Sequence, residues 1–257
     1  MVDAVLPATL RLESSTVTRA GLRALHVQVH LLVEDQPQRT WADIRDLLAD
    51  APVPEPVREA ATTVFSLLAE AEARVHGVAV EDVHFHEVGA WDSVADVVGV
   101  AAAVHLLGAE EVSAGPVSLG SGRVRTAHGE LPVPAQATLH MATGWQVRAG
   151  GDGELATPTS MALLRGLARR CTDLPALHVD AIGVGAGTRD VPGRANVVRV
   201  VLGSPAEPAA HALDGVATAT EVSRNCPSSR PMSTTSTHGS GPPCSTRCSR
   251  RAPPTRG

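Results

Sequence analysis

The sequence predicts a mixed α+β fold, in which strands pack with helices, followed by a disordered tail. Apolar and polar residues alternate, as they do in strands, near residues 9–33 and 176–202. Apolar residues recur at intervals of three and four, as they do in helices, within residues 41–49, 57–75 and 93–107. Because both patterns are spread along the chain, neither an all-helical nor an all-strand fold is expected.

The composition supports a folded core and excludes several classes of function. Hydrophobic residues make up 43% of the 257 residues, and with two Phe and no Tyr the core must consist of Val, Leu and Ala. A net charge of −5 and few aromatic side chains argue against binding of nucleic acid. No stretch approaches the roughly 18 apolar residues of a membrane span, and no signal segment opens the chain. We therefore expect a cytoplasmic protein that has no membrane contact.

The N-terminal part predicts a strand pair and two helices. Residues 9–33 contain two alternating patches, which we expect to pair as antiparallel strands. Thr40 is a suitable N-cap for a helix over residues 41–49. A Pro-rich turn then separates this helix from a longer one, which Gly77 ends.

The residues from His84 to Asp92 gather metal-binding and proton-handling side chains. If residues 83–88 form a strand, His84 and His86 project from the same face. Imidazoles suit Ni²⁺, Cu²⁺, Zn²⁺ or Fe²⁺, and Glu87 or Asp92 could add a carboxylate ligand or accept a proton. The spacing is equally compatible with histidines on a solvated strand face and with Asp92 as a helix N-cap.

Two later segments could bind an anion. The Gly120-Ser121-Gly122 bend precedes Arg123 and Arg125, and this pattern suits either an anionic group or an ordinary turn. Thr157, followed by Pro158, opens a helix whose first N–H groups could bind a phosphate, although a well-capped helix needs no ligand.

The remaining elements complete the α+β pattern. We expect a strand over residues 112–119, a helix from about 135 to 143, and strands at 177–179 and 197–202. The glycines between the last two strands do not follow the dinucleotide-binding spacing, so a long loop or a hairpin is expected there.

The end of the chain does not look like a segment that folds. From Ser223 to Gly257 there is no Val, Ile, Leu, Phe, Trp, Asp or Glu, so burial cannot offset the entropy of ordering. A basic tail that contacts an acidic partner is one interpretation, and a change of reading frame between about residues 215 and 233 is the favoured one. We therefore divide the chain into a folded region, 1–203, and a linker with a frame-changed, disordered tail, 204–257.

Six motifs follow one another along the chain: His84-Phe85-His86-Glu87-Val88-Gly89-Ala90, Asp92-Ser93, Gly120-Ser121-Gly122, Ala127-His128-Gly129-Glu130-Leu131-Pro132-Val133-Pro134, Glu154-Leu155-Ala156-Thr157-Pro158-Thr159 and Gly185-Ala186-Gly187-Thr188-Arg189-Asp190. In this order, over about residues 2–202, they resemble the LarC family, the nickel-insertion proteins of nickel-pincer cofactor synthesis. Two features depart from the family: its opening strand with a Gly-Asp-Met segment is missing, and residues 34–44 lack its His-rich stretch.

The resemblance implies a nickel-inserting enzyme of the lyase class. Such an enzyme inserts Ni²⁺ into a pyridinium-3,5-bisthiocarboxylic acid mononucleotide, forming two Ni–S bonds and one Ni–C bond while CTP is consumed. In some members a programmed frameshift places the CTP site, with its divalent metal, in a separate C-terminal part. That part and the mononucleotide are thus the implied partners, and a homo-oligomer is also compatible with the family.

The resemblance also implies roles for particular residues. The implied metal ligands are His84 and His86. The implied catalytic groups, of which one takes the proton displaced from the ring carbon, are Glu87, Asp92 and His128. The implied residues for the mononucleotide's phosphate are Gly120, Ser121 and Gly122 in the bend and Thr157 and Thr159 at the helix start.

Two other functions are compatible with a His-x-His strand. A metal-dependent hydrolase would retain Zn²⁺, but it usually needs more ligands from later strands than about 200 residues provide. A non-catalytic nickel carrier would bind the metal without forming a cofactor product.

Overall fold

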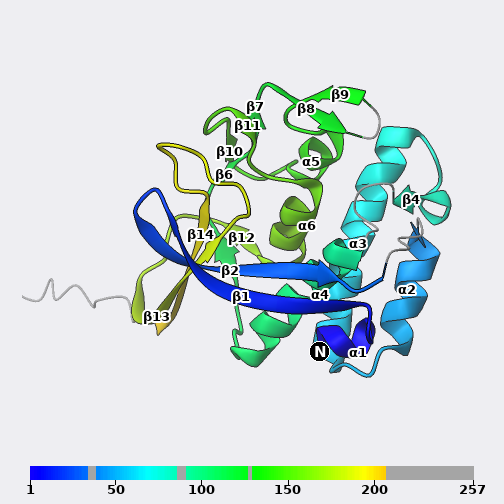
Figure 1. Ribbon diagram of the computed structural model, residues 1–257, viewed down its shortest axis with the longest axis horizontal. Coiled ribbons are helices and arrows are strands. Elements are labelled where there is room, and N and C mark those ends of the chain that lie inside the picture. The colour runs from blue at the N-terminus through cyan, green and yellow to red at the C-terminus, as the bar shows by residue number, and fades with distance from the viewer. Residues whose placement is uncertain (34–38, 86–90, 127–128, 207–257) are drawn as a thin grey trace, which may run out of the picture. The chain divides into compact units, whose positions relative to one another are not determined.

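The computed structural model describes residues 1–33, 39–85, 91–126 and 129–206. By its contacts the chain divides into Met1–Ala209 and Ala210–Gly257, and the description concerns the first of these units. The helices are α1 (Val2–Val5), α2 (Trp41–Asp50), α3 (Glu55–His76), η1 (Val80–Asp82), α4 (Trp91–Leu106), α5 (Gln136–Met141) and α6 (Pro158–Leu167) (Figure 1). The longer strands are β1 (Leu10–Arg19), β2 (Leu22–Leu31), β8 (Arg123–Thr126), β9 (Gly129–Pro132), β13 (Leu177–Ala186) and β14 (Val197–Pro205). The predicted α+β class is confirmed.

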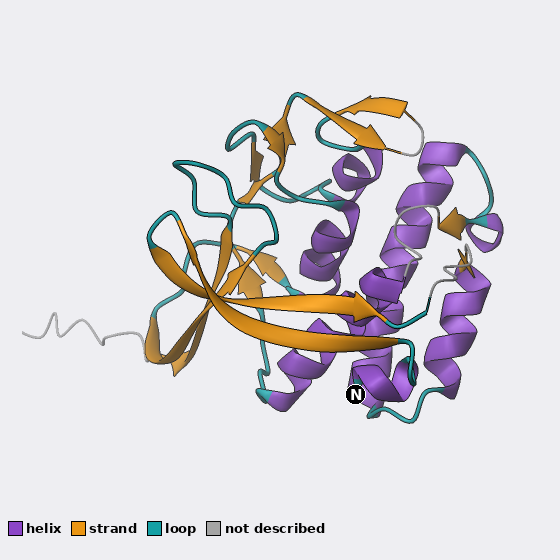
Figure 2. Cartoon of the chain, in the orientation of Figure 1, coloured by secondary structure: helices purple, strands orange, loops and turns teal. Residues whose placement is uncertain are grey.

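The long strands form one four-stranded sheet in the order β1-β2-β13-β14. The predicted N-terminal strand pair is confirmed, because β1 and β2 are antiparallel from Leu10↔Leu31 to Arg19↔Leu22. The second pair is the hairpin β13–β14, which joins the first through a parallel contact at Gly185↔Leu25. In Figure 2 the β13–β14 hairpin lies at the left, and β1 and β2 run from it across to the helices at the right.

The Gly183–Ala186 stretch is a correction to the sequence-based expectation. It was expected to lie between two strands, but it belongs to β13 and pairs with β14, for example at Gly183↔Val200. The connecting loop, residues 187–196, is therefore shorter than expected. Glycine weakens a strand only modestly, so pairing with a neighbouring strand overrides its low propensity.

Local signals set the ends of the helices as expected. Thr40 caps α2 in a capping box: its Oγ1 accepts the Asp43 N–H at 3.1 Å, and the Thr40 N–H donates to the Asp43 carboxylate at 2.8 Å. Gly77 ends α3 in the left-handed conformation. The helix predicted from about Ser93 begins slightly earlier, at Trp91.

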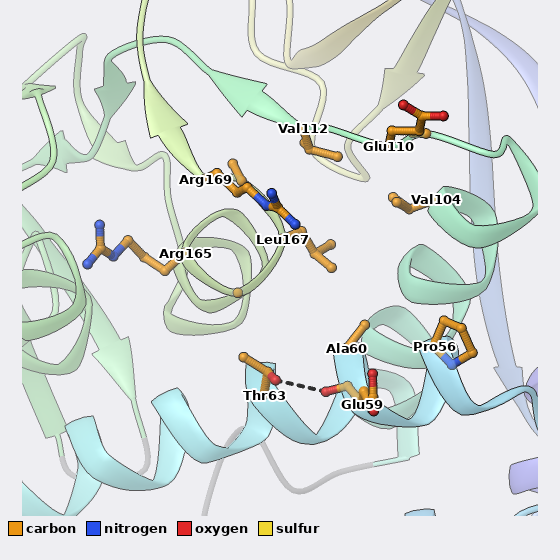
Figure 3. A pocket seen from close by; sticks show the side chains of 13 residues that line it. Pro56, Glu59, Ala60, Thr63, Val104, Glu110, Val112, Arg165, Leu167 and Arg169 are labelled. Atoms are coloured by element: carbon orange, nitrogen blue, oxygen red, sulfur yellow. Dashed lines mark hydrogen bonds between the residues drawn. The ribbon is translucent and has the colours of Figure 1, made fainter.

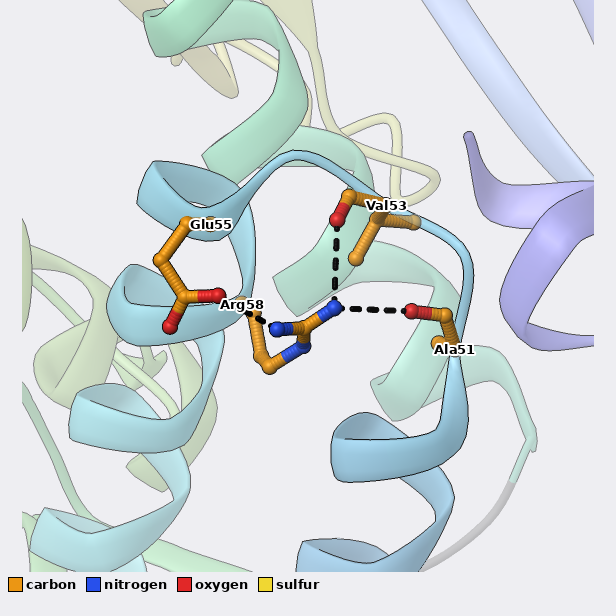
Figure 4. A network of polar contacts seen from close by, with 4 residues as sticks. All are labelled: Ala51, Val53, Glu55 and Arg58. Carbon is orange, nitrogen blue, oxygen red and sulfur yellow. Dashed lines mark hydrogen bonds and ion pairs between the residues drawn. The ribbon is translucent and has the colours of Figure 1, made fainter.

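An arginine fastens α2 to α3. Arg58 Nη2 donates to the carbonyls of Ala51 (3.1 Å) and Val53 (3.3 Å), which follow the C-terminus of α2, while Nη1 pairs with Glu55 (Figure 4). A cation at this end of α2 also interacts favourably with the helix dipole. The link fixes the angle at which the chain enters α3.

Residues 112–119 do not form the single strand that the sequence predicts. They divide at Gly115 and Pro116 into β5 (Ser113–Ala114), parallel to β12 (Arg170–Cys171), and β6 (Val117–Ser118), parallel to β10 (Val147–Arg148). Proline has no N–H to donate, so it interrupts a ladder and lets the chain change partner. The other short pairs are β3 (Arg39–Thr40) with β4 (His84–Phe85), and β7 (Gly120–Ser121) with β11 (Gly153–Glu154).

The hydrophobic core lies among the helices and centres on α3. Val57, Ala61, Val64, Phe65 and Leu68 of α3 have no exposed surface. The Phe65 ring meets Phe85 of β4 edge to face, with 6.2 Å between ring centroids, so β4 is anchored to this core. By contrast Ile182 and Val198 of the long sheet remain 75% and 69% exposed, and the core does not extend over them. No helix in the described ranges is long and apolar enough to cross a membrane.

Candidate functional site

His84, a predicted metal ligand, projects from a short strand pair at the edge of the helical core. It lies opposite Thr40 and is exposed, whereas its neighbours Val83 and Phe85 are buried. Alternation thus sends the imidazole to solvent while its neighbours hold the backbone in place. Hydrogen bonds from Thr40, and further the positive charges of Arg39 and His84, hold the pKa of Asp43 below its usual range. Asp43 is therefore an ionised carboxylate close to His84.

Arg39 and Trp91 connect this strand pair to the start of α4. The Arg39 guanidinium lies 3.2 Å from the centroid of the Trp91 ring, and Arg39 is only 7% exposed. A desolvated stack of this kind is a strong cation–π contact. It places Asp92, the next residue of α4, on the same side of the core as the strand that carries His84.

Asp92, a predicted catalytic group, is exposed in the first turn of α4. Its Oδ1 accepts the N–H of Ser93 at 2.8 Å, and a carboxylate in a first turn is stabilised by the positive end of the helix dipole. Because α4 begins at Trp91, Asp92 lies inside the helix and is not its N-cap.

The other histidines and the glutamate of the predicted centre lie outside the described residues: His86, Glu87 and His128. Within the described ranges, no three His, Cys, Asp or Glu side chains gather closely enough to hold a metal ion. The metal ligands and the catalytic groups thus remain predictions, and of these residues His84 and Asp92 have known positions.

Asp96 is a residue of this region that the sequence reasoning missed. Desolvation of its carboxyl group, and then the charge of Asp92 one turn earlier, raise its pKa from 3.8 to about 6, although the residue as a whole is exposed. The signal in the sequence is the spacing of four, which places Asp92 and Asp96 on the same helix face.

The raised pKa of Asp96 predicts how the protein's stability depends on pH. The folded state holds this proton more tightly than the unfolded state, so its stabilising contribution is complete below about pH 4 and is lost as the pH rises through about 6. The substitution Asp96→Asn removes the titration. We expect the free energy of unfolding of Asp96→Asn, measured by urea denaturation, to fall less than that of the wild type between about pH 4.5 and about pH 7.5.

Asp46→Asn is the matched control for this prediction, because the Asp46 side chain is 74% exposed. Its pH profile should parallel that of the wild type. A wild-type slope retained in Asp96→Asn would contradict the prediction.

The Gly120-Ser121-Gly122 bend, predicted to meet an anion, supports the fold around it. The Gly120 N–H donates to the Ala149 carbonyl at 2.7 Å, so it is not available to a ligand. A Cβ on Gly120 would lie 1.9 Å from the Gly153 carbonyl oxygen, so β7 and β11 approach too closely for any side chain. Ser121 Oγ donates to the Gly151 carbonyl at 2.9 Å.

The helix start at Thr157 lies close to this bend along β11. Glu154 pairs with Gly120, and α6 begins only four residues later. Thr157 caps α6 as predicted, since its Oγ1 accepts the Ser160 N–H at 3.2 Å. Pro158 has no N–H, and the Ser160 N–H is bonded to Thr157. In this first turn the Thr159 N–H is therefore the donor that a ligand could use.

The described site residues lie in two regions of the fold. His84 and Asp92 belong to the first, and Gly120 to Gly122 with Thr157 and Thr159 belong to the second. In Figure 1, β4 lies beside α3, while β7 and β11 lie on the other side of α5.

The arginines near the bend also differ from the expectation. Arg123 is paired with Glu130 across β8 and β9, at 3.4 Å between Nε and Oε2. Arg189, which the sequence analysis named only as part of the last motif, and Arg194, which it did not name, approach the glycines at 153 and 151 instead. The cluster Gly150-Gly151-Asp152-Gly153 was the available signal.

A cavity of about 620 Å³ opens between α3, α4 and the end of α6 (Figure 3). Its charged lining residues are Glu59, Glu110, Arg165 and Arg169, and none of the predicted site residues lines it. Arg165 also lies 5.2 Å from the centroid of the Trp145 ring. The mixed charges give the cavity no clear preference for an anion or a cation.

Comparison with known proteins identifies the class to which this fold and these residues belong. The model of a family described as nickel insertion protein matches residues 2–225. The chain therefore belongs to the nickel insertion protein family.

Curated relatives agree with this assignment. A protein of a Nocardioides species, named pyridinium-3,5-bisthiocarboxylic acid mononucleotide nickel insertion protein, is 49% identical over 208 residues, which cover 80% of this chain and 52% of the relative. A protein of Pelobacter propionicus, named putative nickel insertion protein, is 50% identical over 188 residues, covering 73% and 48%. The chain thus spans about half the length of the curated relatives it matches. No solved structure matches the chain.

Proposed function

We propose that this chain takes part in inserting Ni²⁺ into the pyridinium-3,5-bisthiocarboxylic acid mononucleotide, as the first part of a nickel-inserting lyase. The observation that carries the proposal is the 49% identity, over 80% of this chain, to a relative named for that reaction. CTP and its divalent metal would be bound by a separate C-terminal part. Residues 1–203 would form the N-terminal region of the enzyme, with residues 204–257 following it.

The positions of His84 and Asp92 support this proposal. Insertion requires ligands that bind Ni²⁺ and then release it, and imidazole is a ligand of intermediate softness. His84 is exposed on a strand that the contact of Phe85 with Phe65 anchors to the core. Its side chain can therefore reach the metal without a change in the fold. His86 would be the second ligand.

A base must remove the proton of the ring carbon that becomes bonded to nickel. Glu87, Asp92 and His128 are the proposed candidates, and Asp92 follows Trp91, which contacts Arg39 of the strand paired with the His84 strand. A base that works near neutral pH is most effective when its pKa is close to the working pH. Asp96, whose pKa is raised to about 6 by desolvation and by the charge of Asp92, lies one turn further along α4.

The test is nickel binding by a variant in which His84→Ala and His86→Ala are combined. We expect isothermal titration calorimetry to show at least a ten-fold weaker nickel affinity, because two imidazole ligands are lost. His105→Ala with His178→Ala is the matched control, since both histidines are exposed and lie outside the candidate site. Unchanged nickel binding in the first variant, with equal melting temperatures, would refute the ligand assignment.

A second measurement separates insertion from nickel carriage and from hydrolysis. The chain is incubated with Ni²⁺ and the mononucleotide, with and without the C-terminal half of a relative and CTP, and the product is followed by mass spectrometry. The nickel adduct is the expected product. Nickel binding without any adduct in either mixture would favour a carrier, and retained Zn²⁺ with ester hydrolysis would favour the hydrolase.

A further inference from the structure

The loop between β10 and β11, residues 150–153, is a glycine loop with unused donors. Gly150, Gly151 and Gly153 have φ values of 78°, 139° and 78°. Two of its carbonyls are occupied, because Gly151 O accepts from Ser121 Oγ and Asp152 O accepts from Arg194. The N–H groups of Gly150, Gly151 and Asp152 donate to no other described residue. Consecutive N–H groups in such conformations form concavities that bind anions.

A second loop, residues 187–196, brings two arginines to the glycine loop. A Cβ built on Gly151 would lie 2.6 Å from Arg194 Nη1, and a Cβ on Gly153 would lie 3.8 Å from Arg189 Nη1. Arg194 Nη1 donates to the Asp152 carbonyl at 3.1 Å and keeps its other donors. Within the described part of the chain, the Arg189 guanidinium has neither an ion pair nor a hydrogen bond.

This arginine loop is held in position by the long sheet. Arg19 of β1 donates from Nε and Nη2 to the Gly187 carbonyl, at 3.2 and 3.1 Å. Asn196 Nδ2 donates to the Arg189 carbonyl at 2.9 Å. The backbone at Arg189 is thus fixed before any ligand arrives, which lowers the entropy lost on binding.

Three arginines lie in or beside the two loops. Arg148 donates from Nε to Ser118 Oγ at 3.1 Å, and that hydroxyl lies 2.5 Å from where a Gly150 Cβ would be. Arg189 and Arg194 belong to the arginine loop and Arg148 to the end of β10, and the nearby carboxylates are Asp152, Asp190 and, in β11, Glu154. Asp152 Oδ1 lies 3.3 Å from Ser121 Oγ, whose single proton it shares with the nearer Gly151 carbonyl.

We propose that the glycine loop, with Arg189 and Arg194, binds the phosphate monoester of the mononucleotide. The identity of the ligand rests on the proposed function, whereas the geometry of the site does not. A guanidinium matches two phosphate oxygens with two parallel N–H donors, and backbone N–H groups complete the shell. The Gly120 N–H is already bonded and α6 leaves only the Thr159 N–H, so neither of the predicted phosphate positions offers as many donors.

The test uses two probes, nicotinic acid mononucleotide and the same molecule without its phosphate, nicotinic acid riboside. Affinities of the full chain for each probe are measured by calorimetry. We expect Arg189→Gln to weaken binding of the mononucleotide on the order of 10- to 100-fold, since a charge-assisted hydrogen-bond pair is lost. Arg189→Lys keeps the positive charge but not the paired N–H donors of the guanidinium, so it should show an intermediate loss of affinity.

Two arginines serve as matched controls. Arg199→Gln removes an exposed arginine of β14, and Arg125→Gln removes the remaining arginine beside the predicted bend. Both should bind the mononucleotide as the wild type does, and the riboside should bind weakly and equally to all variants.

The failures of the two proposals are distinguishable. If Arg189→Gln binds the mononucleotide as tightly as Arg199→Gln does, the phosphate site is overturned while nickel insertion is unaffected. If the phosphate site is confirmed but no nickel adduct forms with the C-terminal half and CTP, the proposed function fails and the site stands. A wild type that does not distinguish the two probes also overturns the phosphate site.

Discussion

Phe65→Ala is expected to lower the free energy of unfolding by about 3–5 kcal/mol, as large-to-small changes at fully buried aromatic positions do. Phe65 has no exposed surface and lies in the middle of α3, against which α2, α4, α5 and α6 pack. The chain has two Phe residues, and both belong to the Phe65–Phe85 contact. The core around the ring is closely packed, so its neighbours can fill only part of the cavity that the substitution leaves.

Urea denaturation followed by circular dichroism measures this effect. Leu106→Ala is the control, because Leu106 is 72% exposed and its loss should change the free energy by no more than about 0.5 kcal/mol. A double-mutant cycle with Phe85→Ala should give a coupling of about 0.5–1.5 kcal/mol for the edge-to-face pair. A loss below about 1 kcal/mol in Phe65→Ala would contradict the assigned core.

Gly120→Ala is expected to destabilise the protein by about 3–5 kcal/mol, because two separate costs combine. The added Cβ would lie 1.9 Å from the Gly153 carbonyl oxygen and 3.0 Å from the Leu155 nitrogen. Both are backbone atoms, so no side-chain rotation can relieve the clash. The φ of +95° adds conformational strain for any residue other than glycine.

Gly122→Ala separates these two costs. Its φ is nearly the same, +94°, but nothing lies within 4 Å of the added Cβ. It should therefore cost only the conformational strain, about 1–2 kcal/mol. Equal destabilisation of the two variants in urea would contradict the close approach of β7 and β11. Since this approach also positions the glycine loop, Gly120→Ala should weaken binding of nicotinic acid mononucleotide as well.

The helices could be predicted closely from the sequence because their end signals are local. Thr40 and Thr157 cap the helices that follow them, and Gly77 ends α3, each through contacts within a few residues. The strands were less predictable, since a strand is completed by a partner elsewhere in the chain. Residues 112–119 divide between two partners, and the glycines of β13 are strand because β14 pairs with them.

The candidate site residues also fall into those that local sequence signals indicate and those that only tertiary contacts bring together. The order of the motifs in the sequence points to the family, and His84 and Asp92 were singled out from their spacing. The sequence did not indicate the proposed phosphate site, because Gly151, Arg189 and Arg194 come from loops about 40 residues apart, and Arg194 reaches Asp152 across that separation.

By itself, then, the sequence determined the α+β class and the ends of the main helices, and it predicted a metal-binding role for the segment from His84 to Asp92. Only the tertiary structure decided which strands pair, that the Gly120 N–H is occupied, and that Arg189 and Arg194 meet the glycine loop. The physical reason is that a cap or an apolar stripe depends on neighbours along the chain, whereas a paired strand or an anion site depends on groups that folding alone brings together.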